Sequence, residues 1–202
     1  MRLVVATRNP GKLREVRHRL AREGIEVVGL ADLPSSPEVD EDGDTFAANA
    51  RKKAWALAET TGLPVLADDS GLEVDALGGR PGVRSARFAG PDATDDDNNR
   101  RLLDELRGVA PEERTAAFVC AMVLAVPGPG GGERWAEGRL EGRILERPQG
   151  EGGFGYDPLF WVDEVGKTLA EMGPEEKNRI SHRGRALENL LPALLAWARQ
   201  GR

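Results

Sequence analysis

The chain has 202 residues, of which 40% are hydrophobic and 31% charged, and its formal net charge is −6 at pH 7. This is ordinary globular composition, and the length suits one sizeable α/β domain or one domain with a small lobe. The acidic balance argues against a surface that coats nucleic acid, although it leaves room for a local basic pocket. One cysteine, Cys120, lies in an apolar run, so we expect it to be buried and we exclude a disulfide framework and a cysteine-based zinc site. The apolar run near the start is too short for a signal peptide and no stretch approaches a membrane span, so we expect a cytoplasmic protein.

The first segment has the pattern of a strand, a loop and a helix. Residues 3–6 are a continuous apolar run. Asn9 is a good helix N-cap, Pro10 suits the first helical position, and Gly24 suits the C-terminal cap. Backbone N–H groups at such a helix start, with Lys12 beside them, can bind an anion. An ordinary turn with a solvated lysine accounts for the same residues, and the Walker A pattern is absent.

A second strand is predicted over 25–30, followed by a proline-rich loop over 32–40. The acidic residues 41–44 then precede Thr45, a good N-cap, and a helix from residue 46 to about residue 60.

That helix has one apolar face, formed by Phe46, Ala50, Ala54 and Leu57. Asn49 and Lys53 are four residues apart and flank this face, so they could line a cleft beside it. A capping loop with a solvated helix edge is the alternative.

The middle of the chain holds two adjacent carboxylates. Residues 65–67 read as the end of a buried strand, and Asp68 and Asp69 follow before a turn at Gly71 and a second strand-like run over 72–77. Adjacent carboxylates are costly to desolvate unless cations or hydrogen-bond donors face them. Successive strand side chains point to opposite faces, so at most one of the pair looks into a given cleft. Taken alone, the segment fits a solvated turn better than a binding site.

The next segments predict a helix and a hairpin. Residues 92–106 read as a helix whose first turn is rich in aspartate, which compensation of the helix dipole explains without a metal. Residues 116–126 form a long apolar run typical of a central strand. The glycine-rich turn 127–132 and a more polar strand over 134–141 complete the hairpin. Strands joined by helices early and by a hairpin here indicate a mixed sheet.

Two later segments carry candidate binding residues. The glycine-rich loop 150–158 presents Phe154 as a stacking face for a base, and an apolar strand follows over 159–162. The alternative is a flexible loop whose phenylalanine packs in the core. The cation-rich segment 174–184 is either a solvated helix face or a donor-rich pocket.

Ser181 can cap a final amphipathic helix, which Pro192 is expected to kink. Its buried stripe is formed by Leu187, Leu190, Leu191, Leu194 and Leu195.

Five segments in this order resemble the inosine/xanthosine triphosphate pyrophosphatase family. They are ATRNPGK (6–12), EDGDTFAANARKKA (41–54), ADDSGLEVDALGGRPGVRSARFAG (67–90), FGYDPLF (154–160) and EEKNRISHRGRAL (175–187). Each is a weak signal by itself, but together they span nearly the whole chain.

The resemblance implies an α/β fold: an elongated mixed β-sheet flanked by helices, forming one domain over residues 1–202 with two lobes and a central nucleotide-binding cleft. It also implies a homodimer that uses Mg²⁺ to hydrolyse deaminated purine nucleoside triphosphates (ITP, dITP, XTP) to the monophosphate and pyrophosphate. Such an enzyme removes these nucleotides from the pool.

The same resemblance implies roles for individual residues. Asp69 would be the general base, and Glu41 and Asp69 would bind the metal. The substrate would contact Thr7, Arg8, Asn9, Pro10, Gly11, Lys12, Ser70, Phe154, Gly155, Tyr156, Asp157, Lys177, His182 and Arg183. Donors from His182 or Arg183 would suit the oxygen at position 6 of hypoxanthine and xanthine better than the amino group of adenine.

Two other functions stay open at this point. One is a related pyrophosphatase that acts on modified or pyrimidine nucleotides. The other is a nucleotide-binding module without catalytic activity, in which the carboxylates only recruit Mg²⁺.

Overall fold

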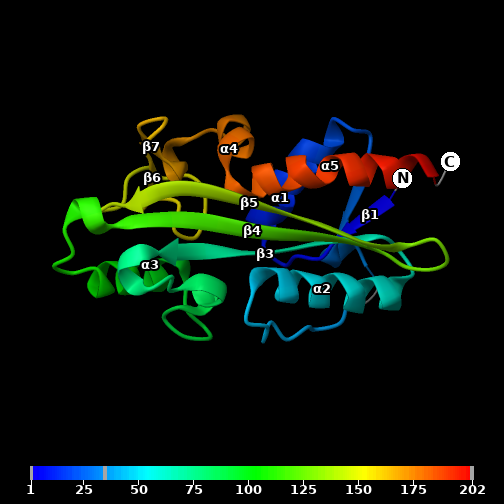
Figure 1. Cartoon of the computed structure of the whole chain (residues 1–202), viewed down its shortest axis with the longest axis horizontal. Helices are drawn as coiled ribbons and strands as arrows, with labels where there is room; N and C mark the ends of the chain where they lie inside the picture. Colours follow the sequence, from blue (N-terminus) through cyan, green and yellow to red (C-terminus); the bar gives the residue numbers. More distant parts are fainter. Residues whose placement is uncertain (1, 34–35, 201–202) are drawn as a thin grey trace. The chain divides into compact units, whose positions relative to one another are not determined.

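The computed structural model describes residues 2–33 and 36–200 of the chain (Figure 1). Among these residues, seven strands form one sheet in the order β2-β1-β3-β4-β5-β6-β7. The strands are β1 (Arg2–Val5), β2 (Glu26–Gly29), β3 (Val65–Val74), β4 (Thr115–Val126), β5 (Gly132–Ile144), β6 (Phe160–Val162) and β7 (Lys167–Thr168). β1 pairs in parallel with β2 and β3, whereas β6 is antiparallel to β5 and β7. The predicted mixed sheet is therefore confirmed. Part of the predicted loop 32–40, residues 34–35, lies outside the described residues.

Two of the helices begin where the sequence predicts caps, whereas the helix predicted from residue 92 begins at Asp95. The helices are α1 (Pro10–Ala21), α2 (Phe46–Thr61), α3 (Asp95–Glu105), α4 (Pro174–Ile180) and α5 (His182–Gln200). Asn9 and Thr45 are the N-caps of α1 and α2, as predicted. The predicted end of α1 is wrong: its C-cap is Arg22, and Gly24 follows at φ +67°, where it turns the chain towards β2.

β3 corrects the prediction for the middle of the chain. The sequence predicts a turn at Gly71, but Val65–Val74 is one continuous strand. Both aspartates lie inside it and are buried. Turn-forming residues are weak local signals. Here side-chain partners from neighbouring elements offset the cost of burying the two carboxylates inside a strand. The strand gives way to a short 3₁₀ helix at Asp75–Leu77, where a continued strand was expected.

The cation-rich segment near the C-terminus forms a helix of its own. Pro174 is the first residue of α4, and Ser181 is its C-cap and directly precedes α5. The leucine stripe of α5 is buried or partly buried as predicted. Pro192 lies inside the helix, and the kink stays a prediction.

Two units make up the chain, and β3, β4 and β5 each contribute to both. The first unit comprises Met1–Asp69, Cys120–Gly138 and Arg183–Arg202. Its sheet is covered by α1 and α5 on one face and by α2 on the other (Figure 1). Alternation along the strands sorts the side chains. In β1, Leu3 and Val5 pack with α1 and α5, and Val4 packs with α2.

The second unit comprises Ser70–Val119 and Arg139–His182. Its core joins apolar residues of β3, β4 and β5 with Leu102 and Leu106 at the end of α3. Tyr156 of the glycine-rich loop and Phe160 of β6 also belong to this core. The loop is thus tied to a packed core at its C-terminal end. No helix among the described residues is both long and apolar enough to cross a membrane.

Candidate active site

The turn between β1 and α1 is held by its own side chains. The Asn9 side chain accepts hydrogen bonds from the backbone N–H groups of Gly11 (2.8 Å) and Lys12 (3.2 Å), and Thr7 Oγ1 accepts one from Asn9 N–H (3.1 Å). Arg8 is exposed and forms an ion pair with Glu38 (2.8 Å). Two of the N–H groups expected to bind an anion therefore donate to the cap in this structure.

Asp68 is the centre of a buried ion-pair network in the first unit. Its Oδ2 lies 2.9 Å from Lys12 Nζ and 3.2 Å from Arg183 Nε. Arg183 also donates through Nη1 to Glu15 on α1. Burial by itself raises the pKa of Asp68, but the charges of Lys12 and Arg183 lower it by more, and the net pKa lies well below its usual range. Asp68 is therefore a permanently charged group that links α1 and α5.

Asp69 faces a different set of partners, on α2 and the loop before it. Its Oδ2 accepts a hydrogen bond from Asn49 Nδ2 at 2.9 Å, and Asn49 Oδ1 accepts one from Gly43 N–H at 2.8 Å. Burial raises the pKa of Asp69 above its usual value, although the charge of Lys53 and the Asn49 hydrogen bond act in the opposite direction. Lys53 Nζ also lies 3.2 Å from Glu41 Oε2.

This cluster brings together the two predicted metal ligands. The charge of Glu41 contributes to the raised pKa of Asp69, so the two carboxylates are electrostatic neighbours. Within residues 2–33 and 36–200, no group of three or more His, Cys, Asp or Glu side chains is arranged to hold a metal alone. A divalent ion that also binds substrate phosphates needs only one or two protein carboxylates, so the pair fits such an ion. Enzymes that cleave phosphoric anhydrides generally use a divalent metal.

The sequence predicted only that Asn49 and Lys53 could line a cleft, without linking them to the carboxylates. Asn49 is 1% exposed and contacts Asp69 directly, and Lys53 lies beside both carboxylates. Their spacing of four residues on α2 was the available signal. Glu15, which binds Arg183, was missed altogether.

In the second unit, a buried ion pair supports the glycine-rich loop. Lys177 Nζ lies 2.6 Å from Asp157 Oδ2, and both side chains are less than 10% exposed. The same oxygen accepts a hydrogen bond from Phe154 N–H at 2.8 Å. Lys177 Nζ also lies 4.4 Å from the centre of the Phe154 ring, a cation–π distance. Gly153 has φ +77°, and a Cβ atom there would lie 2.2 Å from Asp157 Oδ2, so only glycine fits.

Three further predicted residues also belong to the second unit. Tyr156 is buried, and its hydroxyl donates to the backbone oxygen of Ser85 at 2.8 Å. The His182 ring is buried and stacks on Phe118 with ring centres 4.7 Å apart. Ser70 is half-buried and follows Asp69 in β3. The structure thus divides the predicted residues into a charged set around Asp68 and Asp69 in the first unit and a set that includes Phe154, Tyr156 and His182 in the second.

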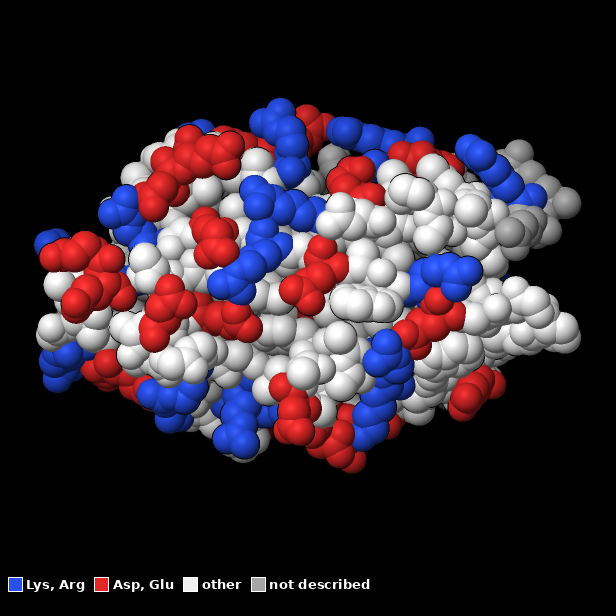
Figure 2. Space-filling view, viewed as in Figure 1, with Lys and Arg blue, Asp and Glu red and all other residues white. Residues whose placement is uncertain are grey.

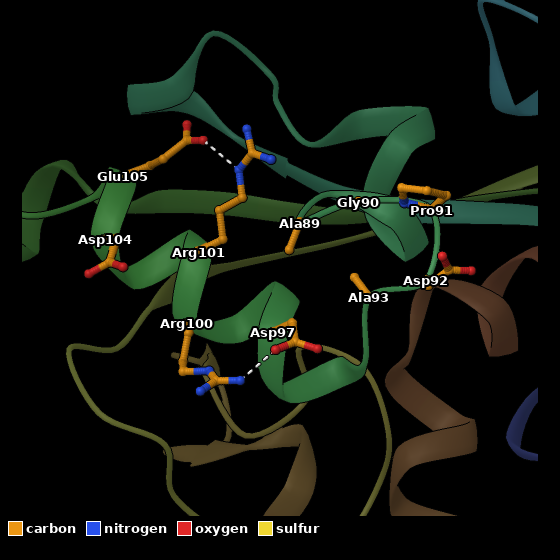
Figure 3. Close-up of a pocket in the computed structure, with 10 residues that line it drawn as sticks. All are labelled: Ala89, Gly90, Pro91, Asp92, Ala93, Asp97, Arg100, Arg101, Asp104 and Glu105. Carbon is orange, nitrogen blue, oxygen red and sulfur yellow. Dashed lines mark hydrogen bonds and ion pairs between the residues drawn. The ribbon is translucent and has the colours of Figure 1, made fainter.

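The protein surface also contains a hollow that none of the predicted site residues line. Basic and acidic side chains are interspersed on the face shown in Figure 2. Exposed residues also form ion pairs, for example Lys52 with Asp42. A hollow of about 670 Å³ in the second unit lies between α3 and residues 89–93 (Figure 3). Two arginines that line the hollow form ion pairs within α3, Arg100 with Asp97 and Arg101 with Glu105.

Known proteins match nearly the whole chain. A family model described as the Ham1 family matches residues 3–193. A relative from Geobacter sulfurreducens named dITP/XTP pyrophosphatase is 57% identical over 197 residues, which cover 97% of each chain. A Ham1 protein structure from Coxiella burnetii has a TM-score of 0.86 at 40% identity, covering 97% of this chain and 99% of that one. A structure from Mycobacterium abscessus titled nucleoside-triphosphatase / dITP/XTP pyrophosphatase has a TM-score of 0.74 at 48% identity, covering 95% and 100%.

Proposed function

This chain belongs to the Ham1 family, and from that membership and the geometry of the charged cluster we propose that it hydrolyses ITP, dITP and XTP to the monophosphate and pyrophosphate. The observation that carries the proposal is the Asp69 carboxylate. It is buried, its pKa is raised, and it lies beside Lys53 and Glu41. A carboxylate with a raised pKa is suited to accept a proton near neutral pH, and the nearby charges suit a phosphate substrate.

Lys12 and the turn over residues 7–11 would bind the triphosphate. Lys12 Nζ lies at the helix start, where its charge adds to the partial positive charge of α1. Its ion pair with Asp68 holds the side chain in place. A lysine ammonium group has three N–H donors in all, so it could also bind a phosphate oxygen.

Glu41 and Asp69 would hold Mg²⁺ together with phosphate oxygens. Both offer hard carboxylate oxygens, and Lys53 offsets their negative charge when the ion is absent. When bound, Mg²⁺ neutralises charge on the phosphate oxygens and so makes the α-phosphorus easier to attack.

Asp69 would act as the general base in the reaction. Water forms a new bond to the α-phosphorus, the bond from this phosphorus to the bridging oxygen breaks, and pyrophosphate leaves. The Asp69 carboxylate takes the proton that the water loses. Asn49 Nδ2 donates a hydrogen bond to that carboxylate at 2.9 Å, which would keep it oriented through the step.

The second set of residues would bind the nucleoside. The Phe154 ring offers a stacking face, and Lys177 and Asp157 fix the loop that carries it. Gly155 and Tyr156 belong to the same loop, and Ser70 would contact the substrate next to Asp69. Donors from His182 and Arg183 would favour an oxygen at position 6 of the base over an amino group. Guanine carries the same oxygen, so this contact alone does not exclude GTP.

Assembly and location belong to the same proposal. We infer a homodimer in the cytoplasm, with no nucleic-acid or membrane partner. Light scattering on the purified protein at several concentrations tests the dimer.

A panel of nucleoside triphosphates tests the function. ITP, dITP, XTP, GTP, ATP and CTP are incubated with and without Mg²⁺, and both pyrophosphate and phosphate are measured. We expect IMP and pyrophosphate from ITP, in a reaction that needs the metal. Phosphate as the first product, without added pyrophosphatase, would contradict the proposal. A preference for pyrimidine nucleotides would favour the related pyrophosphatase, and binding without turnover would favour the non-catalytic module.

A further inference from the structure

Two side chains on one face of α3 form hydrogen bonds with Gly155 in the glycine-rich loop. Asp95 Oδ2 accepts a hydrogen bond from Gly155 N–H at 2.7 Å, and Asn99 Nδ2 donates one to Gly155 O at 2.9 Å. Asp95 and Asn99 are four residues apart, so they lie one above the other on the helix surface. Both backbone polar groups of Gly155 are therefore bound by neighbouring side chains of one helix.

The same helix also supports Tyr156, the next residue of the loop, indirectly through Asn98 and Ser85. Asn98 accepts a hydrogen bond from Ala89 N–H (2.8 Å) and donates one to Ala86 O (3.1 Å), which fixes the segment that follows Ser85. Ser85 O accepts the hydrogen bond from the Tyr156 hydroxyl. The position of Tyr156 thus depends on α3 through Asn98, and that of Gly155 depends on α3 directly.

Compensation of the helix dipole does not account for these contacts. Asp97 forms a capping box with Thr94 and so completes the N-terminus of α3 by itself. Asp95 reaches a backbone N–H that lies 60 positions away in the chain. Asn99 makes its contact although its Oδ1 is buried and has no hydrogen-bond partner among the described residues. A buried amide with one unsatisfied atom is costly and calls for an explanation, and holding the Gly155 carbonyl would supply one.

Gly155 is also the point where the loop needs an external constraint. It has φ +61°, and it lies between Phe154, whose N–H is bound by Asp157, and Tyr156, whose hydroxyl is bound by Ser85. A glycine in this region has more backbone freedom than any other residue. Asp157 and Lys177 hold Phe154 on one side of Gly155, and the two contacts from α3 hold the peptide groups of Gly155 itself.

We propose that Asp95 and Asn99 are positioning residues that hold Gly155, and with it the Phe154 ring, in the orientation that binds the nucleoside. This inference rests on the proposed function of the loop, and it goes beyond it by assigning a role to α3. The triphosphate end of the substrate does not depend on these contacts.

Matched variants separate this role from a general loss of structure. Asp95→Ala removes the acceptor for Gly155 N–H, Asp95→Asn keeps a side-chain oxygen there, and Asp96→Ala removes a charge from the same turn without altering the contact. Asn99→Ala removes the donor to Gly155 O. Each variant is assayed for kcat and KM with ITP and for inhibition by tripolyphosphate, which has phosphates but no nucleoside.

We expect KM for ITP to rise about 2- to 10-fold in Asp95→Ala and in Asn99→Ala, as for the loss of one hydrogen bond, with kcat changed much less. Asp95→Asn and Asp96→Ala should stay close to the wild type. The inhibition constant of tripolyphosphate should not change in any of them. An unchanged KM, an equal rise in Asp96→Ala, or a parallel weakening of tripolyphosphate binding would each overturn the inference.

Hydrogen exchange tests the contact without relying on activity. The peptide that contains Gly155 should exchange faster in Asp95→Ala and in Asn99→Ala than in the wild type, while peptides from β4 keep their protection. Equal protection of the Gly155 peptide in all proteins would contradict the constraint itself. A wild type that releases no pyrophosphate from ITP would instead contradict the proposed function, and the exchange result would still decide whether α3 holds the loop.

Discussion

Asp68 and Asp69 are adjacent in β3, yet their carboxylates bind residues on opposite faces of the sheet. Asp68 contacts Lys12 of α1 and Arg183 of α5, whereas Asp69 contacts Asn49 of α2. The period of two along a strand requires this divergence. It also separates their electrostatics: two cations hold the pKa of Asp68 low, while burial raises that of Asp69. One carboxylate is suited to hold structure and the other to accept a proton.

The first prediction compares the two carboxylates in catalysis. Asp69→Asn should lower kcat about 100-fold or more, the usual contribution of a general base, because an amide cannot accept the proton. Asp68→Asn should lower kcat less, because its side chain points to the other face. Steady-state kinetics with ITP at saturating Mg²⁺ measures both. Should Asp68→Asn be the more damaging change, the assignment of the base to Asp69 is wrong.

The second prediction concerns stability in acid. The pKa of Asp68 is lowered on folding, so its ion pairs contribute stability that is fully present above the ordinary aspartate pKa of about 4 and is lost as the pH falls below it. In the wild type the free energy of unfolding should therefore fall steeply below pH of about 4. The fall should be shallower in Asp68→Asn, by up to about 1.4 kcal/mol per pH unit.

Urea unfolding at several pH values between about 2.5 and 6 measures this difference. Asp104→Asn, which alters a surface aspartate on α3, is the matched control and should keep the slope of the wild type. Equal slopes in the wild type and Asp68→Asn would show that other groups dominate acid unfolding.

The third prediction concerns the metal. Glu41→Gln should raise the Mg²⁺ concentration needed for half-maximal rate, because a neutral amide oxygen is a weaker ligand for a hard cation. The rate at saturating Mg²⁺ should fall less than in Asp69→Asn. Asp44→Asn removes a nearby exposed charge and is the control. A metal requirement that Glu41→Gln and Asp44→Asn raise equally would point to general electrostatics instead of a ligand.

Local signals in the sequence predicted the parts that depend on neighbouring residues. The Asn9 and Thr45 caps, the buried face of α2 and the divergence of Asp68 from Asp69 all follow from short-range geometry. The turn expected at Gly71 was wrong, because strand pairing and long-range partners outweigh the turn preference of an Asp-Asp-Ser-Gly run.

For the same reason, contacts between residues far apart in the chain could not be predicted from the sequence. Glu15 and Arg183 are 168 positions apart, and Asp95 and Gly155 are 60 apart. Each pair meets only because the fold brings two helices or a helix and a loop together. No spacing rule in a single sequence encodes such a contact. The five family segments, by contrast, named candidate site residues without the fold, because the resemblance extends over nearly the whole chain.

The last prediction concerns Arg183, for which the sequence and the structure suggest different uses. The family resemblance assigns its guanidinium to the base, while the structure shows it bound to Asp68 and Glu15 in a buried network. Arg183→Ala leaves both carboxylates without this partner, so the free energy of unfolding should fall by about 3–5 kcal/mol. Glu15→Gln disturbs the same network without removing a proposed substrate contact, and it should also destabilise the protein.

The ratio of kcat/KM for ITP to that for ATP separates the two uses. A guanidinium always donates and cannot accept, so it favours an oxygen at position 6 and cannot pair with an amino group. If it contacts the base, Arg183→Ala should lower the ratio by roughly 10- to 100-fold, the effect of one charge-assisted hydrogen bond. Glu15→Gln should leave the ratio unchanged. A ratio that also stays constant in Arg183→Ala, with both rates falling together, would confine Arg183 to the ion-pair network and leave His182 as the candidate for base selection.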